Sequence, residues 1–147
     1  MGTYLRTATL ADAEMILKWR NDAVTRANSF SKDEIALDTH IKWMEGRLSD
    51  EASAMYIMMD GESCVGQLRI DKVKGVGEIS YMIAPDERKK GYGKQIIALA
   101  QEVAGADIKA LMGLVEKANA PSAKCFLAND YAEFVGGTEL CYIKILA

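Results

Sequence analysis

The stretch Glu78-Ile-Ser-Tyr-Met-Ile-Ala-Pro-Asp-Glu-Arg-Lys-Lys-Gly91-Tyr-Gly93-Lys94 decides the fold of this 147-residue chain. Its first part predicts a strand, which ends at Pro85 because proline cannot donate a hydrogen bond to a sheet. Apolar residues at helical spacing from Ile96 to Val103 then predict a helix. A glycine-rich turn between a strand and a helix exposes backbone N–H groups at the positive end of the helix dipole. The stretch therefore predicts a phosphate-binding turn.

Positive charge surrounds this turn, in the side chains of Arg88, Lys89, Lys90 and Lys94. It is not a Walker loop, because Lys94 is followed by Gln95 rather than by Ser or Thr. Nor is it a dinucleotide fingerprint, because the third glycine of that motif is absent. The alternative to an anion site is a solvated helix start.

The rest of the chain alternates between strand and helix patterns, which indicates a sheet with helices packed on it. Thr9 and Asp12 predict a capping box at the first helix, and Ser31 and Glu34 predict another at the second. Asp60-Gly61 predicts a tight hairpin. The expected strands are 3–8, 55–59, 64–70, 78–84, 108–115, 132–135 and 139–146. The expected helices are 9–20, 31–48, one that follows Pro85 and carries the apolar stripe 96–103, and 121–128.

Composition excludes several classes of function. With 18 Lys and Arg against 21 Asp and Glu, the net charge of −3 argues against duplex DNA or an anionic membrane as the partner. The apolar run 54–59 is too short to cross a membrane, so we expect a soluble, cytoplasmic protein. Cys64, Cys125 and Cys141 lack metal-ligand spacing and indicate reduced cysteines, with no metal.

Residues 81–93 resemble motif A of the GNAT acetyltransferase superfamily, a strand followed by an Arg/Gln-x-x-Gly-x-Gly/Ala loop. Asn119-Ala-Pro-Ser122-Ala-Lys-Cys-Phe126 resembles the Asn-x-x-Ser-x-x-x-Tyr segment of motif B. The resemblance implies a single α/β domain over residues 1–147 with the GNAT fold. This fold has a central, mostly antiparallel sheet, about four flanking helices, and a cofactor cleft where the fourth and fifth strands splay apart.

The resemblance also implies that acetyl-CoA is the acyl donor. Backbone groups of the strand would pair with the pantetheine arm, and the glycine-rich loop would wrap the pyrophosphate. The cofactor-binding residues implied in this way are Tyr81, Met82, Ile83, Arg88, Lys89, Lys90, Gly91, Tyr92, Gly93, Lys94, Asn119, Ser122 and Phe126.

Acetylation in this family proceeds by direct attack of a neutral amine, which favours a nearby base. Glu78 is the first candidate, because strand alternation places it on one face with Ser80, which could hold a bridging water. The alternative for Glu78 is a cross-strand ion pair with Lys72 or Lys74. His40, the one histidine of the chain, is a second candidate base, and the alternative is a residue at the edge of the core.

The proton donor for the leaving CoA thiolate stays unassigned. Many relatives carry a tyrosine where this chain has Phe126, which has no proton to give. Tyr131, Tyr92 or water could serve instead. Because Phe126 replaces this tyrosine, a catalytically silent acyl-CoA-binding module is an alternative to an enzyme.

For the acceptor, Trp19-Arg-Asn-Asp22, Arg26-Ala-Asn-Ser29-Phe30, His40-Ile-Lys-Trp43 and 65–71 resemble a GNAT subgroup that acetylates UDP-linked 4-amino-sugars in pseudaminic acid biosynthesis. Guanidinium groups would hold the substrate diphosphate, and an aromatic ring would stack on a base or sugar. The residues implied are Trp19, Arg20, Asn21, Arg26, Phe30 and Trp43. The alternatives are core aromatics and solvated arginines.

The sequence leaves alternatives for the acceptor, the partner and the oligomeric state. A ribosomal-protein-type protein acetyltransferase is the rival enzyme, since the same strand and loop would serve it. The expected partner is a small-molecule amine and not a nucleic acid, because the basic residues gather at one loop. The chain could be a monomer or a homodimer, and an edge strand at 139–146 would allow two copies to pair.

Overall fold

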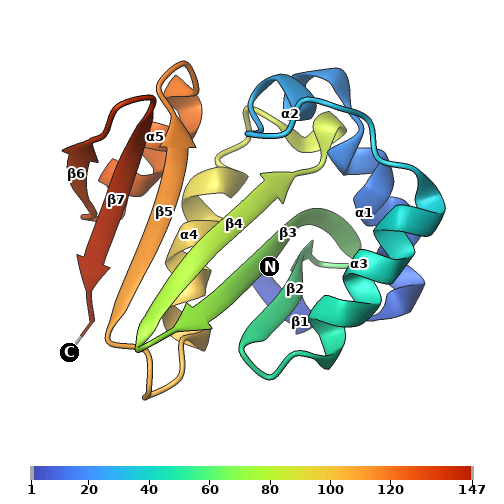
Figure 1. The fold of residues 1–147 in the computed structure, drawn as a ribbon, viewed down its shortest axis with the longest axis horizontal. Coiled ribbons are helices and arrows are strands. Elements are labelled where there is room, and N and C mark those ends of the chain that lie inside the picture. Colours follow the sequence, from blue (N-terminus) through green and yellow to red (C-terminus); the bar gives the residue numbers. More distant parts are fainter. Residues whose placement is uncertain (1, 147) are drawn as a thin grey trace.

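The computed structural model describes residues 2–146, which form a mixed sheet covered by helices on both faces (Figure 1). Within these residues the sheet has seven strands in the order β1-β2-β3-β4-β5-β7-β6. Neighbouring strands are antiparallel except β4 and β5, so the predicted fold class is confirmed. The strands are β1 Thr3–Thr7, β2 Ser53–Asp60, β3 Ser63–Val73, β4 Val76–Ile83, β5 Ala110–Glu116, β6 Ala132–Val135 and β7 Glu139–Ile145.

The helices divide between the two faces of the sheet. The α-helices are α1 Ala13–Arg20, α2 Ala23–Ala27, α3 Leu37–Ser49, α4 Tyr92–Val103 and α5 Ala120–Ala128, and two 3-10 turns are η1 Leu10–Asp12 and η2 Pro85–Glu87. Helices α1 and α3 lie on one face of the sheet, and α4 and α5 lie on the other (Figure 1). Each face accordingly has its own buried cluster, one around Met44 and Ile57 and one around Ile79 and Ile96.

Strands β4 and β5 stay together over only part of their length. They pair in parallel from Val76 and Ala110 to Ile79 and Gly113. Residues 80–83 of β4 lie beyond the last pair, and Figure 1 shows the two arrows diverging toward their carboxyl ends, with α2 near the open end. This divergence is the predicted splay between the fourth and fifth strands. It leaves one edge of residues 80–83 free of a strand partner.

The capping box predicted at Ser31 and Glu34 is wrong. Residues 30–36 form a loop, and α3 begins only at Leu37. Tertiary contacts hold the loop extended. The Asn21 amide donates to the Ile35 carbonyl and accepts from the Ile35 N–H, both at 2.8 Å. These contacts take the backbone groups that a helix would have used.

The prediction that residues 139–146 form an edge strand is also wrong. Strand β7 lies between β5 and β6, so the edge strands are β1 and β6. The sequence pattern alone cannot reveal this order, because β7 pairs directly with β5 although β6 comes between them along the chain. Two copies of the chain could therefore not pair through residues 139–146 without displacing a neighbour.

Candidate active site

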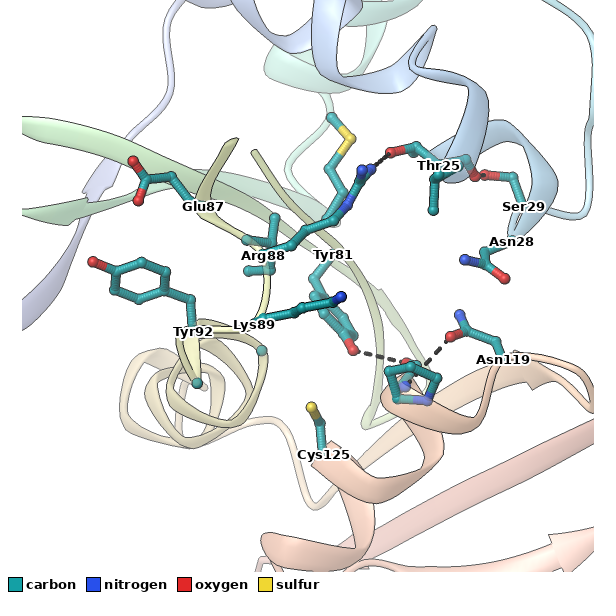
Figure 2. A pocket seen from close by; sticks show the side chains of 17 residues that line it. Thr25, Asn28, Ser29, Tyr81, Glu87, Arg88, Lys89, Tyr92, Asn119 and Cys125 are labelled. Carbon is teal, nitrogen blue, oxygen red and sulfur yellow. Dashed lines mark hydrogen bonds between the residues drawn. The ribbon is translucent and has the colours of Figure 1, made fainter. Parts of the chain in front are cut away.

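A cavity of about 490 Å³ opens beside the diverging end of β4 (Figure 2). Four parts of the chain line it, namely α2, β4, the loop that leads into α4, and the start of α5. The lining residues are Val24, Thr25, Asn28, Ser29, Tyr81, Met82, Ile83, Glu87, Arg88, Lys89, Gly91, Tyr92, Gly93, Asn119, Pro121, Ser122 and Cys125.

The glycine-rich loop has the backbone conformation that its sequence demands. Gly91 caps α4 with a φ of 83°, in the left-handed region that favours glycine. Gly93 meets a different demand, because a Cβ there would lie 2.9 Å from the Cys125 sulfur, so it lets α4 and α5 approach. The first turn of α4 leaves N–H groups without intrahelical partners beside the cavity, where they can bind an anion.

Two basic side chains of the loop have different surroundings. Arg88 donates to the Asp22 carboxylate at 2.6 Å and to the Thr25 hydroxyl at 2.8 Å. This contact keeps the pKa of Asp22 below its usual value. Figure 2 shows Arg88 reaching Thr25 across the cavity, while Lys89 extends into the space between them and Asn119. Lys89 is thus placed to meet an anion, and Arg88 is tied to α2.

The wall opposite α2 carries a polar pair. The Tyr81 hydroxyl lies 2.7 Å from the Ser122 hydroxyl (Figure 2). Burial raises the pKa of Tyr81 above its usual value, and burial also raises the pKa of the neighbouring Cys125 thiol. Both groups are therefore protonated at neutral pH.

A family model described as an acetyltransferase (GNAT) domain matches residues 3–131 of the chain. The chain belongs to the GNAT family. It is an acetyl-CoA-dependent N-acetyltransferase, as the motif A and motif B segments had indicated. A search among curated proteins found no match.

Solved structures share the fold of this GNAT acetyltransferase at low sequence identity. An aminoglycoside acetyltransferase in complex with coenzyme A aligns with a TM-score of 0.85 and 14% identity, over 98% of this chain and 95% of that one. Spermidine N-acetyltransferase from Vibrio cholerae, in complex with CoA and spermine, aligns with 0.86 and 15%, over 97% and 95%. An N-acetyltransferase from Staphylococcus aureus Mu50 aligns with 0.83 and 18%, over 100% of both chains.

The GNAT cavity gathers most, but not all, of the residues predicted to bind the cofactor. Tyr81, Met82, Ile83, Arg88, Lys89, Gly91, Tyr92, Gly93, Asn119 and Ser122 line it. Lys90, Lys94 and Phe126 are absent from the described lining. Lys90 pairs with Glu87 at 2.9 Å, and Lys94 is exposed on α4.

Phe126 departs furthest from its predicted place. Its side chain is 1% exposed and stacks on Tyr142 with ring centroids 5.2 Å apart. It fills the space that Gly113 leaves on β5, where a Cβ would lie 2.3 Å from the ring. The position that many relatives fill with tyrosine therefore belongs to the core in this chain.

Sequence reasoning missed the contribution of α2. Val24 and Thr25 of α2 line the cavity, as do Asn28 and Ser29 just after it. The five residues of α2 include no buried one. A helix this short shows no periodic apolar pattern that would predict it. Glu87, Pro121 and Cys125 were also missed, although they lie inside the two recognised motifs.

The two candidate catalytic residues of β4 lie on the face opposite Tyr81. Glu78 is half-buried, beside Asp71 of β3 and Met112 of β5. Among residues 2–146 no ion pair joins it to Lys72, which instead contacts Asp107. Ser80 accepts a hydrogen bond from Arg69 at 3.3 Å.

His40 lies away from the cavity. It is 3% exposed, stacks on Trp43 with ring centroids 5.8 Å apart, and hydrogen-bonds the backbone of Ala13. Its Nε2 has no hydrogen-bond partner within residues 2–146. Burial lowers the pKa of His40 below its usual value. This environment agrees with a core residue between α3 and α1 better than with a base.

The predicted acceptor residues also serve the fold. Trp19 is buried, whereas Phe30 is exposed on the loop after α2. The guanidinium of Arg20 donates to the Ser31 carbonyl at 2.8 Å, and that of Arg26 donates to the Asn21 carbonyl at 3.1 Å. Asn21 holds Ile35 as described above. These side chains therefore shape the loop that follows α2, although Nη1 of Arg20 is buried without a hydrogen-bond partner within residues 2–146.

Trp43 is the member of this set that faces the region of Ser80. The Arg69 guanidinium lies over its ring, 5.0 Å from the ring centre, and reaches Ser80 with the same group.

Among residues 2–146 no cluster of acidic, His or Cys side chains is arranged to hold a metal, and no helix there is long and apolar enough to cross a membrane.

Proposed function

We propose that this acetyltransferase binds acetyl-CoA in the cavity beside β4 and transfers the acetyl group to a primary amine of a small molecule in a ternary complex. One observation carries the proposal. The glycine-rich start of α4 and the unpaired residues 80–83 of β4 border the same cavity. The first offers N–H groups to phosphate oxygens, and the second offers a free strand edge to an amide-bearing chain.

The roles of the donor-site residues follow from this placement. The N–H groups near Gly91 and Gly93, together with Lys89, would hold the pyrophosphate. Tyr81, Met82 and Ile83 would pair through their backbone with the pantetheine arm. Arg88 would act indirectly, by holding α2 over the cavity through Asp22.

The chemistry needs no covalent enzyme intermediate. The amine nitrogen attacks the thioester carbonyl, a C–N bond forms, the C–S bond breaks, and a strand N–H stabilises the oxyanion. Glu78 would take the amine proton, directly or through water, because it is the carboxylate of β4 next to the splay. Cys125 is a poor nucleophile, since burial keeps its thiol protonated.

For the acceptor we propose an amino group on a sugar, with a UDP-linked 4-amino-sugar as the first compound to test. Its support is the sequence resemblance of segments 19–22, 26–30 and 65–71. Arg20 and Arg26 donate to backbone carbonyls, and Arg69 beside Trp43 is paired with Asp71 at 2.8 Å, so a diphosphate would have to displace one of these contacts. Because relatives of the same fold act on aminoglycosides and spermidine, these amines belong in the same test.

The test measures release of CoA thiol from acetyl-CoA with UDP-4-amino-sugars, kanamycin, spermidine and ribosomal-protein amino-terminal peptides offered in parallel. Turnover with a small-molecule amine supports the proposal, and turnover with the sugar nucleotide supports its finer form. Turnover with peptides alone overturns the small-molecule acceptor. Acetyl-CoA binding without turnover on any amine would favour a silent binding module.

The donor site is tested by a matched pair of lysine variants. Lys89→Ala removes the cation that lines the cavity, whereas Lys117→Ala removes an exposed lysine that binds the Gly137 carbonyl elsewhere. We expect Lys89→Ala to raise the Kd for acetyl-CoA about three- to tenfold, as for one phosphate contact. Equal effects of the two variants would contradict the assignment of this cavity to acetyl-CoA.

A further inference from the structure

Two hydroxyl groups meet on the wall of the cavity next to the point where β4 and β5 part. Tyr81 comes from β4, two residues after Ile79, the last β4 residue paired with β5. Ser122 comes from the first turns of α5, and the two oxygens are 2.7 Å apart. Ser122 is 9% exposed and Tyr81 is half-buried, so both hydroxyls are only partly open to water. Figure 2 shows the Tyr81 hydroxyl between the side chains of Lys89 and Cys125.

The other hydroxyl groups of the lining bond to groups outside this pair. The Tyr92 hydroxyl donates to Asp60 at 2.6 Å. The Thr25 hydroxyl accepts from Arg88, and the Ser29 hydroxyl donates to the Thr25 carbonyl at 2.7 Å. Among the described lining residues, Tyr81 and Ser122 are thus the two hydroxyls that pair with each other, and the Cys125 thiol lies next to Tyr81.

The aromatic residues of the α5 region offer no alternative donor to the cavity. Phe126 has no hydroxyl, and it is buried beneath Gly113. Tyr131 is 4% exposed and packs against Phe126 with ring centroids 5.1 Å apart, in the core behind the sheet. Neither belongs to the described lining of the cavity.

The reaction creates a need for a proton in this cavity. Breaking the C–S bond leaves the electron pair on sulfur as a thiolate, and a thiolate shielded from water is unfavourable unless it is protonated or hydrogen-bonded. We propose that the Tyr81 hydroxyl donates the proton to the departing thiolate sulfur, and that Ser122 passes a replacement proton from solvent to the phenolate. This inference rests on the proposed function of the cavity.

The proton balance closes without a further reactant. The amine loses one proton to Glu78 or water, the thiolate gains one from Tyr81, and Ser122 returns one to Tyr81. Burial keeps Tyr81 protonated at neutral pH, so it has a proton to give, and the hydroxyl lies beside the space that the thioester would fill. Tyr81 is therefore a catalytic residue of β4, in place of one on α5.

The experiment titrates the thiol of bound coenzyme A through the ultraviolet absorbance of its thiolate, with the complex of desulfo-coenzyme A as the blank. Tyr81→Phe keeps the ring, which packs edge-on against Phe126, and removes only the hydroxyl. Because the hydroxyl stabilises the sulfur anion, we expect Tyr81→Phe to raise the pKa of the bound thiol by about one unit, a tenfold change in the ionisation constant. Ser122→Ala should give a smaller rise.

Tyr131→Phe is the matched control, since it removes a hydroxyl from the core and should leave the bound thiol unchanged. With any acceptor that turns over, Tyr81→Phe should lower kcat about ten- to a hundredfold at an unchanged Kd for acetyl-CoA. A bound thiol with the same pKa in Tyr81→Phe and wild type would overturn the inference. Failure of the wild type to bind coenzyme A would instead overturn the proposed function itself, so the two failures are distinguishable.

Discussion

Arg88 donates to Asp22 across the mouth of the cavity, with the Arg88 nitrogen 2.6 Å from the carboxylate oxygen. Asp22 also caps α2 by accepting from the N–H groups of Val24 and Thr25. Since α2 buries no side chain, polar contacts of this kind decide where it lies. A residue expected at the pyrophosphate therefore serves to position one wall of the cavity.

Loss of the Arg88 contact should loosen α2 without unfolding the protein. We expect Arg88→Ala to speed amide hydrogen exchange in residues 23–27 about two- to fivefold, because a partly exposed ion pair contributes about 0.5–1 kcal/mol. Lys90→Ala is the control, since it removes the ion pair with Glu87 inside the same loop. Equal exchange rates for the two variants would show that α2 does not depend on Arg88.

Burial of His40 should make stability depend on pH in a defined window. Its folded-state pKa lies below the ordinary value of about 6.5, so the unfolded chain binds more protons just below that pH. The free energy of unfolding should therefore fall as pH drops below about 6.5, and His40→Gln should flatten this slope. Urea unfolding at several pH values measures it.

The carboxylates with lowered pKa values change the free energy of unfolding in a different pH range from His40, so the two effects can be told apart. Asp12 and Asp22 lose their stabilising contribution only as pH falls below about 3.9, where the unfolded chain begins to bind protons. A slope between pH 7 and 5 that is the same in His40→Gln and wild type would show that the imidazole is not responsible.

Restoring a tyrosine at position 126 should not create a proton donor. The ring of Phe126 fills the space above Gly113, so a hydroxyl added to it would be crowded and buried. We expect Phe126→Tyr to lower the free energy of unfolding by about 1–3 kcal/mol and to leave kcat no higher than in the wild type.

Tyr131→Phe supplies the comparison for that variant. Within residues 2–146 the Tyr131 hydroxyl is buried without a hydrogen-bond partner, so its removal should be neutral or stabilising. Denaturant midpoints of the two variants measure the difference. A gain in kcat for Phe126→Tyr would mean that the ring can reach the cavity after all.

Two glycines should respond to alanine in opposite directions. Gly91 has a φ of 83°, so Gly91→Ala strains the backbone and should cost about 1 kcal/mol or more. Gly46 lies exposed inside α3 with open space around its Cα, so Gly46→Ala should stabilise by about 0.5–1 kcal/mol. Thermal midpoints measure both. A stabilising Gly91→Ala would mean that the loop can adopt another conformation.

Prediction from sequence succeeded where neighbouring residues set the structure. The Asp60-Gly61 hairpin, the end of β4 before Pro85 and the stripe of α4 all depend on local backbone preferences and on periodicity. It failed for residues 30–36, where a local capping signal was outweighed by hydrogen bonds from Asn21. It also missed α2, because this helix buries no residue and so shows no apolar pattern in the sequence.

The sequence by itself determined the positions of the strands along the chain and the glycine-rich start of α4, because glycine, proline and apolar spacing act within a few residues. Only the tertiary structure decided which side chains share the cavity. Arg88 meets Asp22 over 66 positions of sequence, and Tyr81 meets Ser122 over 41. Such contacts arise only when packed helices and strands bring distant residues together, and the same packing moved Phe126 into the core.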